Sequence, residues 1–277
     1  MYNSILFNGG LYNGTFNLGG IQTSNENLSF NGFGLQNEKI ITSNVDFEKI
    51  DRDFVTASIP NGHGKIINSD FWRLKRITIS GMMNGATRTE LDNTIDEFKK
   101  ELAVQNKNFD FITGDGTKRR YFCTASVIDV DRSEHFMITL ANFRVIFDCL
   151  VPFGQDLEYT VNDYTVNELE FSEVLENKGN APGDPVFLLI VNTATAITGI
   201  NLKNNTTSQE IEITETISAS DVLIFDSELK KVTLNGTEID FDGQFPIVNA
   251  GSNSYTVTAT GTDIEYELTA KVIPKYL

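Results

Sequence analysis

Alternating apolar and polar positions run through the second half of the chain and predict short β-strands. Residues 255–260 alternate Tyr, Val and Ala with threonines, and residues 264–271 alternate Ile, Tyr, Leu and Ala with Glu, Thr and Lys. A period of two places the apolar side chains on one face of a strand. Similar short segments recur at a spacing of roughly 10 residues, which is typical of a β-sandwich. Asn235-Gly236 between two of these segments predicts a two-residue hairpin turn.

The first half of the chain contains one helical pattern, from Thr87 to about Val104. Thr87 and Glu90 have the T-x-x-E spacing of a capping box, in which the threonine hydroxyl caps the helix and the glutamate reaches back. Four apolar residues fall at i, i+4, i+7 and i+11 and so share one face of the helix: Leu91, Ile95, Phe98 and Leu102. We expect the helix to pack on a sheet through this face.

Strand patterns surround the predicted helix. One half-buried strand precedes it at 73–83, and three strands rich in aromatic and β-branched residues follow at 108–113, 119–130 and 134–147. This order predicts an α+β domain in which the helix packs on an antiparallel sheet or split barrel. The predicted fold class of the whole chain is therefore mainly β with one α-helix.

Charge separates the chain into two parts. The chain has 277 residues and a formal net charge of −16; 16 basic and 18 acidic residues precede Pro152, whereas 6 basic and 20 acidic residues follow it. We predict an N-terminal domain at 1–155 and a C-terminal sandwich domain at 156–277. The linker is expected around 152–165, and a Gly/Pro-rich loop at 176–185 is expected to enter the sandwich. Nonspecific binding of the acidic second domain to DNA or to an anionic membrane is unfavourable.

The segment GDGTKRRYF, residues 114–122, combines two glycines with three consecutive basic residues. It lacks the G-x-x-x-x-G-K-[ST] spacing of a phosphate-binding loop, and no predicted helix follows whose first turn could hold phosphate. The glycines are instead typical of a hairpin turn. We interpret the segment as a β-hairpin with a basic flank.

Residues with metal-binding or catalytic chemistry form no recognisable motif. Cys123 and Cys149 have neither zinc-ligand spacing nor the number of a disulfide framework, so we expect buried free thiols. No nucleophile motif lies near His63 or His135. Residues 129–134 begin like a calcium loop but lack the required glycine and the final glutamate. We predict no catalytic residue, no metal and no cofactor.

No targeting or membrane-spanning segment is expected. The N-terminus has no charged region followed by an apolar core, as a signal peptide would. The longest apolar run, VFLLIV at 186–191, is far shorter than the roughly 20 residues needed to span a bilayer.

The order of these elements resembles the distal tail protein family of long-tailed bacteriophages. The resemblance covers about residues 40 to 277 and rests on the strand RLKRITISGMM, the helix TRTELDNTIDEFKKEL, the hairpin FDFITGDGTKRRYFCTASV and the strand FMITLANFRVIFDCLVPFG. Its most distinctive motifs are N-x-G-N-x-x-x-x-P at 177–185 and the series D…V…NG…FP…G-x-N that ends at Asn253.

This resemblance implies a structural protein of the virion tail tip that is assembled in the host cytoplasm. Its N-terminal domain would form a homo-hexameric ring that joins the tail tube protein to the tail-associated hub protein. A galectin-like or carbohydrate-module-like sandwich would project from the ring and dock receptor-binding or tail-fibre proteins. The family implies no catalytic residue, no specific nucleic acid binding and no membrane insertion.

Within such a ring, the basic hairpin is expected to form a contact between subunits. We predict that Lys118, Arg119 and Arg120, with the adjacent Tyr121, meet carboxylates of a neighbouring subunit, the tube above or the hub below. The rival hypothesis is a carbohydrate-binding adhesion module whose sandwich contacts host cell-wall polysaccharide directly. A glycoside hydrolase is a third hypothesis, although no pair of acidic residues is singled out for that reaction.

Overall fold

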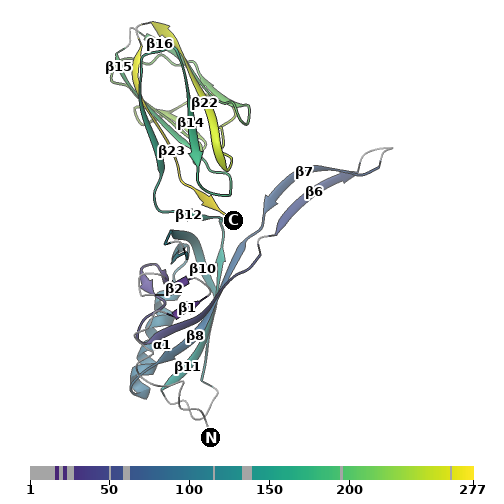
Figure 1. The fold of residues 1–277 in the computed structure, drawn as a ribbon, viewed down its shortest axis with the longest axis vertical. Coiled ribbons are helices and arrows are strands. Elements are labelled where there is room, and N and C mark those ends of the chain that lie inside the picture. The colour runs from purple at the N-terminus through teal and green to yellow at the C-terminus, as the bar shows by residue number, and fades with distance from the viewer. Residues whose placement is uncertain are drawn as a thin grey trace. The chain divides into compact units, whose positions relative to one another are not determined.

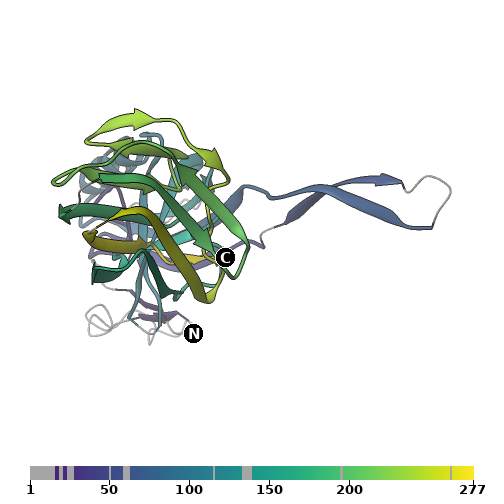
Figure 2. The same ribbon diagram turned by 90° about the horizontal axis from the view of Figure 1, so that it is seen from above.

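The computed structural model describes residues 16–18, 21–23, 28–49, 51–58, 63–114, 116–132, 139–193, 196–262 and 264–277. It divides the chain into two compact units, Met1–Gly154 and Gln155–Leu277. The described residues form mostly antiparallel β-strands with one helix, which confirms the predicted fold class (Figures 1 and 2). The repeated Asn/Gly phrases at the start of the sequence lie largely outside the described residues.

One main sheet forms the framework of the N-terminal unit. Its strands run in the order β4 (Phe33–Gly34), β3 (Leu28–Phe30), β9 (Lys107–Ile112), β10 (Lys118–Asp131), β11 (Leu140–Cys149), β8 (Lys75–Asn84) and β5 (Ile40–Phe47). In the described part of the chain the two end strands, β4 and β5, are not paired with each other, so the sheet is open and the split-barrel alternative is wrong. Two further strands, β1 (Phe16–Leu18) and β2 (Ile21–Thr23), pair with each other.

The helix α1 (Arg88–Leu102) covers one face of this sheet. The Thr87 hydroxyl accepts a hydrogen bond from the Glu90 backbone N–H at 3.2 Å, as the capping motif predicts. The Glu90 carboxylate reaches one residue further back and accepts from the Ala86 backbone N–H at 2.9 Å. The ring of Phe98 lies 5.1 Å from that of Phe143 on β11, so the apolar face of the helix joins the core of the sheet.

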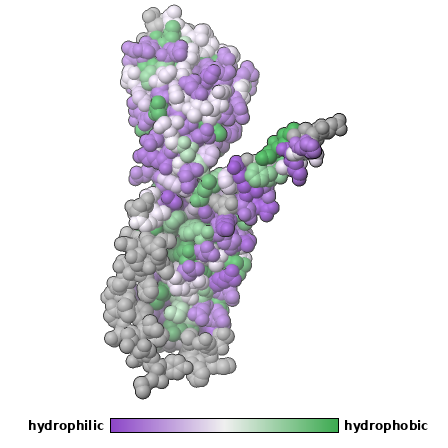
Figure 3. All heavy atoms as spheres, turned by 45° about the vertical axis from the view of Figure 1, so that its right-hand side comes forward, coloured by the Kyte–Doolittle hydropathy of each residue, from purple (hydrophilic) through white to green (hydrophobic). Residues whose placement is uncertain are grey.

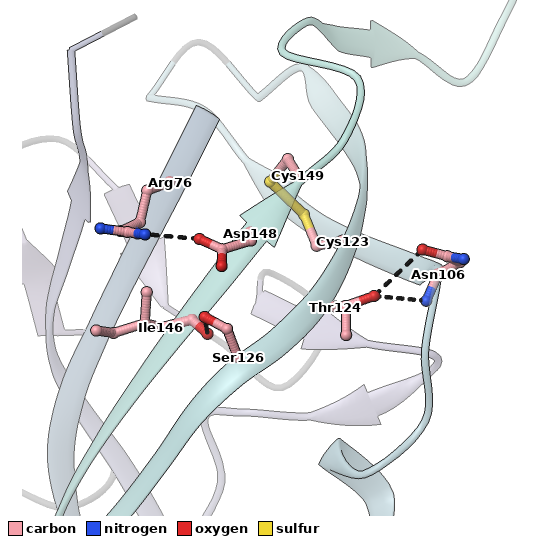
Figure 4. Close-up of a disulfide and its surroundings, with 8 residues drawn as sticks. All are labelled: Arg76, Asn106, Cys123, Thr124, Ser126, Ile146, Asp148 and Cys149. Carbon is pink, nitrogen blue, oxygen red and sulfur yellow. Dashed lines mark hydrogen bonds and ion pairs between the residues drawn. A yellow bond between two sulfur atoms is a disulfide. The ribbon is translucent and has the colours of Figure 1, made fainter. Parts of the chain in front are cut away.

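The two cysteines are paired rather than free. Cys123 on β10 and Cys149 on β11 lie directly opposite each other in the antiparallel register, with Cα atoms 4.1 Å apart, and form a disulfide (Figure 4). The prediction of free thiols was wrong because it considered spacing along the sequence, whereas strand register brings together residues that are 26 positions apart. Both side chains are fully buried, so the burial part of that prediction is confirmed.

Two strands that were not predicted lie within residues 52–72. β6 (Arg52–Ser58) and β7 (Lys65–Trp72) pair in antiparallel register and form a two-stranded sheet of their own. They follow β5 and precede β8 in the chain, and they form a long ribbon (Figure 2). We call these two strands, Arg52–Ser58 and Lys65–Trp72, the arm.

The C-terminal unit is a β-sandwich. One sheet runs β13 (Thr160–Val166), β23 (Glu265–Val272), β15 (Val186–Thr193), β18 (Val222–Asp226), β19 (Lys231–Leu234) and β20 (Thr237–Ile239). The other runs β14 (Glu170–Asn177), β22 (Gly251–Thr262), β16 (Ala196–Asn204), β17 (Gln209–Ile213) and β21 (Asp242–Gly243). One apolar core of residues from both sheets lies between them.

The start of the sandwich differs from the sequence-based interpretation. β13, at the edge of a sheet, includes residues 160–165 of the predicted linker, and β14 occupies residues that were assigned to no strand. The short strands β12 (Gly154–Asp156) and β24 (Lys275–Tyr276) pair with each other. Asn235 and Gly236 have φ values of 51° and 79°, which confirms the predicted two-residue hairpin turn.

Candidate interaction site

The basic hairpin joins β9 and β10 through a tight turn. The Thr113 backbone N–H donates to the Thr117 carbonyl at 2.9 Å, and the Gly116 N–H donates to the Thr113 carbonyl at 2.9 Å. Gly116 has a φ of 87°, a conformation that favours glycine. These bonds confirm that the glycines serve a turn. The chain continues into the strand β10 and not into a helix, so the turn lacks the helix N-terminus that a phosphate loop requires.

Two of the three basic side chains of this hairpin already face a carboxylate of their own subunit. Arg120 lies opposite Asp110 in the register and donates two hydrogen bonds to it, at 2.7 and 2.9 Å. The Lys118 ammonium lies 3.9 Å from the same carboxylate. The hydrogen bond to Asp110 raises the pKa of Arg120 above its usual value. Asp110 is therefore satisfied within the subunit, and Lys118 is the more weakly held of the two cations.

The other two predicted residues point to the core side of β10. Tyr121 is only 2% exposed, and burial raises its pKa to about 12. The ammonium group of the buried Lys75 lies 5.3 Å from its ring centroid, and burial, with a smaller contribution from the charge of Arg119, lowers the pKa of that lysine. The side chain of Tyr121 thus stabilises the fold and does not reach the surface on which we predicted it. Arg119 is partly buried beside this cluster.

The four predicted residues of the helix face lie in the core. Ile95 is 4% exposed and the other three are fully buried: Leu91, Phe98 and Leu102. Their contacts include rings from neighbouring elements, such as that of Phe33 at 6.4 Å from Phe98. These residues position the sheet and offer no surface for a partner.

The arm is the part of the N-terminal unit that sequence reasoning missed. About half the surface of each of five apolar side chains on it is exposed: Phe54, Val55, Ile66, Ile67 and Phe71. Apolar residues gather along this ribbon in the space-filling view (Figure 3). At its base, the Arg52 guanidinium lies 4.7 Å from the ring centroid of Trp72, and Arg73 pairs with Asp53 at 2.6 Å. Side chains at the base of the arm thus contact each other, whereas the apolar side chains beyond it are exposed to solvent.

In the C-terminal unit, the residues of the most distinctive sequence motif form a network of hydrogen bonds. The buried Asn177 side chain donates to the Ala181 carbonyl at 2.8 Å and accepts from the Gly179 N–H at 2.9 Å. A Cβ atom on Gly179 would lie 2.1 Å from the Lys275 carbonyl oxygen, so only glycine fits there. The Asn180 side chain accepts from the Leu277 N–H at 2.8 Å. The motif therefore specifies the fold and not a reaction.

The second motif likewise stabilises loops of the sandwich. The Asn235 side chain donates to Asp221 at 2.7 Å and accepts from the Val222 N–H at 2.9 Å. The buried Asn253 accepts from the Asn249 N–H at 3.0 Å and donates back to the Asn249 carbonyl at 2.8 Å. Both interactions fix turns at the ends of strands.

One shallow pocket of about 280 Å³ lies on the sandwich and is lined by Gln209, Lys230, Gly243, Gln244, Phe245 and Ile247. The Lys230 ammonium lies 5.7 Å from the Phe245 ring centroid. Across the described ranges, no group of three or more His, Cys, Asp or Glu side chains is placed to hold a metal ion. His63 is exposed, and His135 lies outside the described residues. None of the helical segments that the structure describes is long and apolar enough to cross a membrane.

Comparison with known proteins gives a match for part of the sequence and for the fold. Residues 178–269 match the family model described as "Siphovirus-type tail component, C-terminal domain". No curated protein sequence matches the chain. Among solved structures, the fold is similar to the crystal structure of the SPP1 Dit (gp 19.1) protein, with a TM-score of 0.69 and 14% sequence identity over 91% of this chain and 99% of that chain. The phage P2 baseplate in its activated conformation with Ca also matches, with a TM-score of 0.38 and 8% identity over 83% of this chain and 90% of that chain.

The matched residues include the second hydrogen-bonded motif of the sandwich and all of the first except Asn177, and the likeness to the SPP1 protein extends through both units. The resemblance first seen in the sequence is thereby confirmed. Residues 178–269 thus match the C-terminal domain of siphovirus-type tail components, and the fold of the chain is similar to that of the SPP1 Dit protein.

Proposed function

We propose that six copies of the chain close into a ring through their N-terminal units at the tip of the tail. The ring joins the tail tube protein to the tail-associated hub protein, and the C-terminal sandwich docks receptor-binding or tail-fibre proteins. The observation that carries this proposal is the fold shared with the SPP1 protein, whose structure is described as a paradigm of the hub adsorption apparatus in phages that infect Gram-positive bacteria. None of these roles needs a catalytic residue.

Native mass spectrometry of the purified full chain tests the ring. We expect a six-subunit species, and antibody labelling in electron micrographs should place the protein at the distal end of the tail. A species of another size would contradict the hexamer, and labelling elsewhere on the virion would contradict the tail-tip location.

The basic hairpin supplies a second test of the ring. Because Arg120 is occupied by Asp110, we propose that Lys118, whose side chain is 41% exposed, meets a carboxylate of the next subunit. Lys118→Glu should weaken the contact by about 1 kcal/mol, or roughly fivefold in dissociation constant, as exposed ion pairs do. Lys107→Glu, on an exposed residue of the same hairpin, is the matched control. Equal association of the two variants in sedimentation velocity would exclude this contact.

A second candidate function is binding of host cell-wall polysaccharide by the sandwich. The pocket beside Lys230 and Phe245 favours it, because the amide groups of Gln209 and Gln244 and the Lys230 ammonium line it above a largely buried aromatic ring. A glycan array with host wall polysaccharide tests this function, with Gln209→Ala and Lys230→Ala as pocket variants. Binding that both variants abolish would support it, and absence of binding by the intact chain would exclude it.

A further inference from the structure

The strand β15 of the sandwich is apolar on both of its faces. Its inward side chains belong to the core between the two sheets: Phe187, Leu189 and Val191. Its outward side chains lie outside that core and are partly exposed: Val186, Leu188 and Ile190. A strand with one face in water normally alternates apolar and polar residues, whereas an uninterrupted apolar run is typical of a strand that is covered on both faces. The run VFLLIV therefore indicates a second covering for this strand.

The neighbouring strand β18 extends this apolar surface. In the antiparallel register Leu188 lies opposite Ile224, and Ile190 lies opposite Val222. Both β18 residues are partly exposed, and the residues that alternate with them are buried. Residues two apart on one strand, and residues directly opposite on the next, are neighbours on one face of a sheet. We call this continuous surface the outer patch: Val186, Leu188, Ile190, Val222 and Ile224.

Polar residues surround the outer patch. Thr269 on β23 lies opposite Leu188. Thr233 on β19 lies opposite Ile224. Charged residues of the adjacent strands flank the ends of the patch: Asp226, Glu267 and Lys271. An apolar centre within a polar rim is the usual anatomy of a protein–protein interface.

The other sheet of the sandwich has a polar outer face. Threonines occupy outward positions of its strand β22: Thr256, Thr258 and Thr260. Asn201 on β16 lies opposite Thr258, and the Ser172 hydroxyl on β14 lies 2.9 Å from that of Thr256. Val174, on the edge strand β14, is an apolar exception. The two outer faces thus differ in chemistry, and the apolar one is specific to the sheet that contains β15.

The size of this face suits one partner molecule per copy. Six strands about 4.8 Å apart, each with about five residues across the face, cover about 500 Å². Small and transient protein interfaces bury less than about 600 Å² on each partner. The outer patch and its rim therefore have the area of a small protein interface.

Charge determines which partner fits the outer patch. Residues 155–277 contain 6 basic and 20 acidic residues, so the unit has a net charge of −14. A second copy would bring the same charge to the contact and would be repelled, and so would a nucleic acid. A protein with basic residues around an apolar centre gains both the apolar contact and the attraction to the acidic unit.

We propose that the outer patch docks a protein other than this chain, through a partner surface that is apolar at its centre and basic around it. The inference rests on the proposed function, because it names the face of the sandwich that holds the receptor-binding or tail-fibre protein. The polar outer face of the other sheet stays in solvent.

Cysteine accessibility tests this arrangement in the full chain. Both cysteines of the chain form the disulfide, so an introduced cysteine is its single free thiol. Thr233→Cys places this thiol at the border of the outer patch. Thr258→Cys places it on the polar outer face of the other sheet and is the matched control. The rate of maleimide labelling is measured in the purified chain and in purified phage tails that contain the variant.

We expect protection at one of the two positions. The Thr233→Cys variant should be labelled roughly tenfold more slowly in tails than as the purified chain, because a covered thiol reacts only while the partner is dissociated. The Thr258→Cys variant should be labelled at the same rate in both. Equal protection of the two positions, or protection of neither, would overturn the inference.

Cross-linking in tails identifies the occupant of the outer patch. A benzophenone maleimide attached to the Thr233→Cys variant is irradiated, and the cross-linked peptides are identified by mass spectrometry. We expect a protein other than this chain, with more basic than acidic residues around the cross-linked site. A cross-link to a second copy of the chain, or to an acidic surface, contradicts the proposal.

Binding of the cross-linked protein, once purified, measures the contribution of the outer patch. Leu188→Glu should raise the dissociation constant by at least about tenfold, because it buries a charge at the centre of the contact. Thr258→Glu is the control and should leave the dissociation constant unchanged. Thr233→Arg repels a basic partner from the border of the patch, and it provides the same test if Leu188→Glu lowers the thermal midpoint. Unchanged binding by a folded variant of either kind would refute docking at this face.

The outcomes separate this inference from the proposed function. If purified tails do not contain the chain, the proposed role in the tail fails. If tails contain the chain and the Thr233→Cys variant is labelled in them as fast as in the purified chain, the outer patch is not a docking surface while the proposed ring stands.

Discussion

Glu173 on β14 is the residue whose charge is least compatible with its place in the fold. Its side chain is 6% exposed, and neither carboxylate oxygen has a hydrogen-bond partner among the described residues. Burial raises its pKa from an ordinary 4.5 to about 7, and the nearby Tyr164 hydroxyl acts in the opposite direction. Tyr255 lies directly opposite on β22, so an aromatic neighbour and not a cation faces the carboxyl group.

We predict that the C-terminal unit loses stability as the pH rises. The folded form holds the proton of Glu173 more tightly than the unfolded chain does, so this contribution is complete below about pH 4.5 and is lost as the pH rises through 7. A shift from 4.5 to about 7 corresponds to roughly 3 kcal/mol in the free energy of unfolding. Hydrogen exchange of the β14 amides at pH 5 and pH 8 should show the difference.

Glu173→Gln should remove this pH dependence. The neutral side-chain amide has no proton to lose in this range. The backbone amides of β14 should therefore exchange more slowly at pH 8 in the variant than in the intact chain. Glu176→Gln, at an exposed position on the same strand, is the control and should retain the original dependence. Equal pH profiles for the two variants would show that the buried carboxyl is not the group responsible.

Phe98 is the largest of the buried side chains that attach the helix α1 to the sheet. Phe98→Ala removes a fully buried ring that lies 5.1 Å from Phe143, and should cost about 3–5 kcal/mol. This is a large part of the roughly 5–15 kcal/mol that stabilises a typical domain. Urea unfolding followed by the fluorescence of Trp72, the single tryptophan of the chain and a member of this unit, measures the loss.

Lys99→Ala provides the comparison for that experiment. Lys99 is the next residue of the same helix but is exposed, so its truncation should change the free energy of unfolding by a few tenths of a kcal/mol. A midpoint for Phe98→Ala equal to that of Lys99→Ala would contradict the packing of the helix on the sheet.

Elements specified by neighbouring residues were predictable from the sequence. The capping residues Thr87 and Glu90 and the helical spacing of the apolar residues define α1 within a few positions, because every interaction involved is local. The Asn235-Gly236 turn is local as well, since its positive φ angles follow from the residue types. The alternating strands β22 and β23 were also predictable, because each has one face on the core and one in water.

Features that depend on distant partners were not predictable. The Cys123–Cys149 disulfide follows from the register of β10 and β11, which no local pattern fixes. The arm has consecutive apolar residues, such as Val55 after Phe54, which place apolar side chains on both faces and break the alternation of a half-buried strand. The arm would be recognisable only if an external partner were assumed.

The net charge of the chain would oppose formation of the proposed ring. Each copy carries −16, and residues 152–277 hold 20 of its acidic residues against 6 basic ones. Repulsion between exposed charges extends over a Debye length of about 30 Å at 10 mM salt, but only about 10 Å at 100 mM. Apolar contacts between subunits have no comparable long-range electrostatic component.

We therefore predict that salt strengthens the assembly. Raising sodium chloride from about 10 to 150 mM should shift sedimentation toward the ring, because it screens the repulsion and leaves the apolar contact unchanged. A control variant with four exposed acidic residues of the C-terminal unit changed to Gln should assemble at low salt with a weaker dependence: Glu168, Glu170, Glu212 and Glu215. If salt instead dissociates the ring, then ion pairs between subunits, such as the one proposed for Lys118, contribute more to association than the repulsion opposes it. The interface would then be held by charge, because an apolar contact between like-charged subunits cannot weaken when their repulsion is screened.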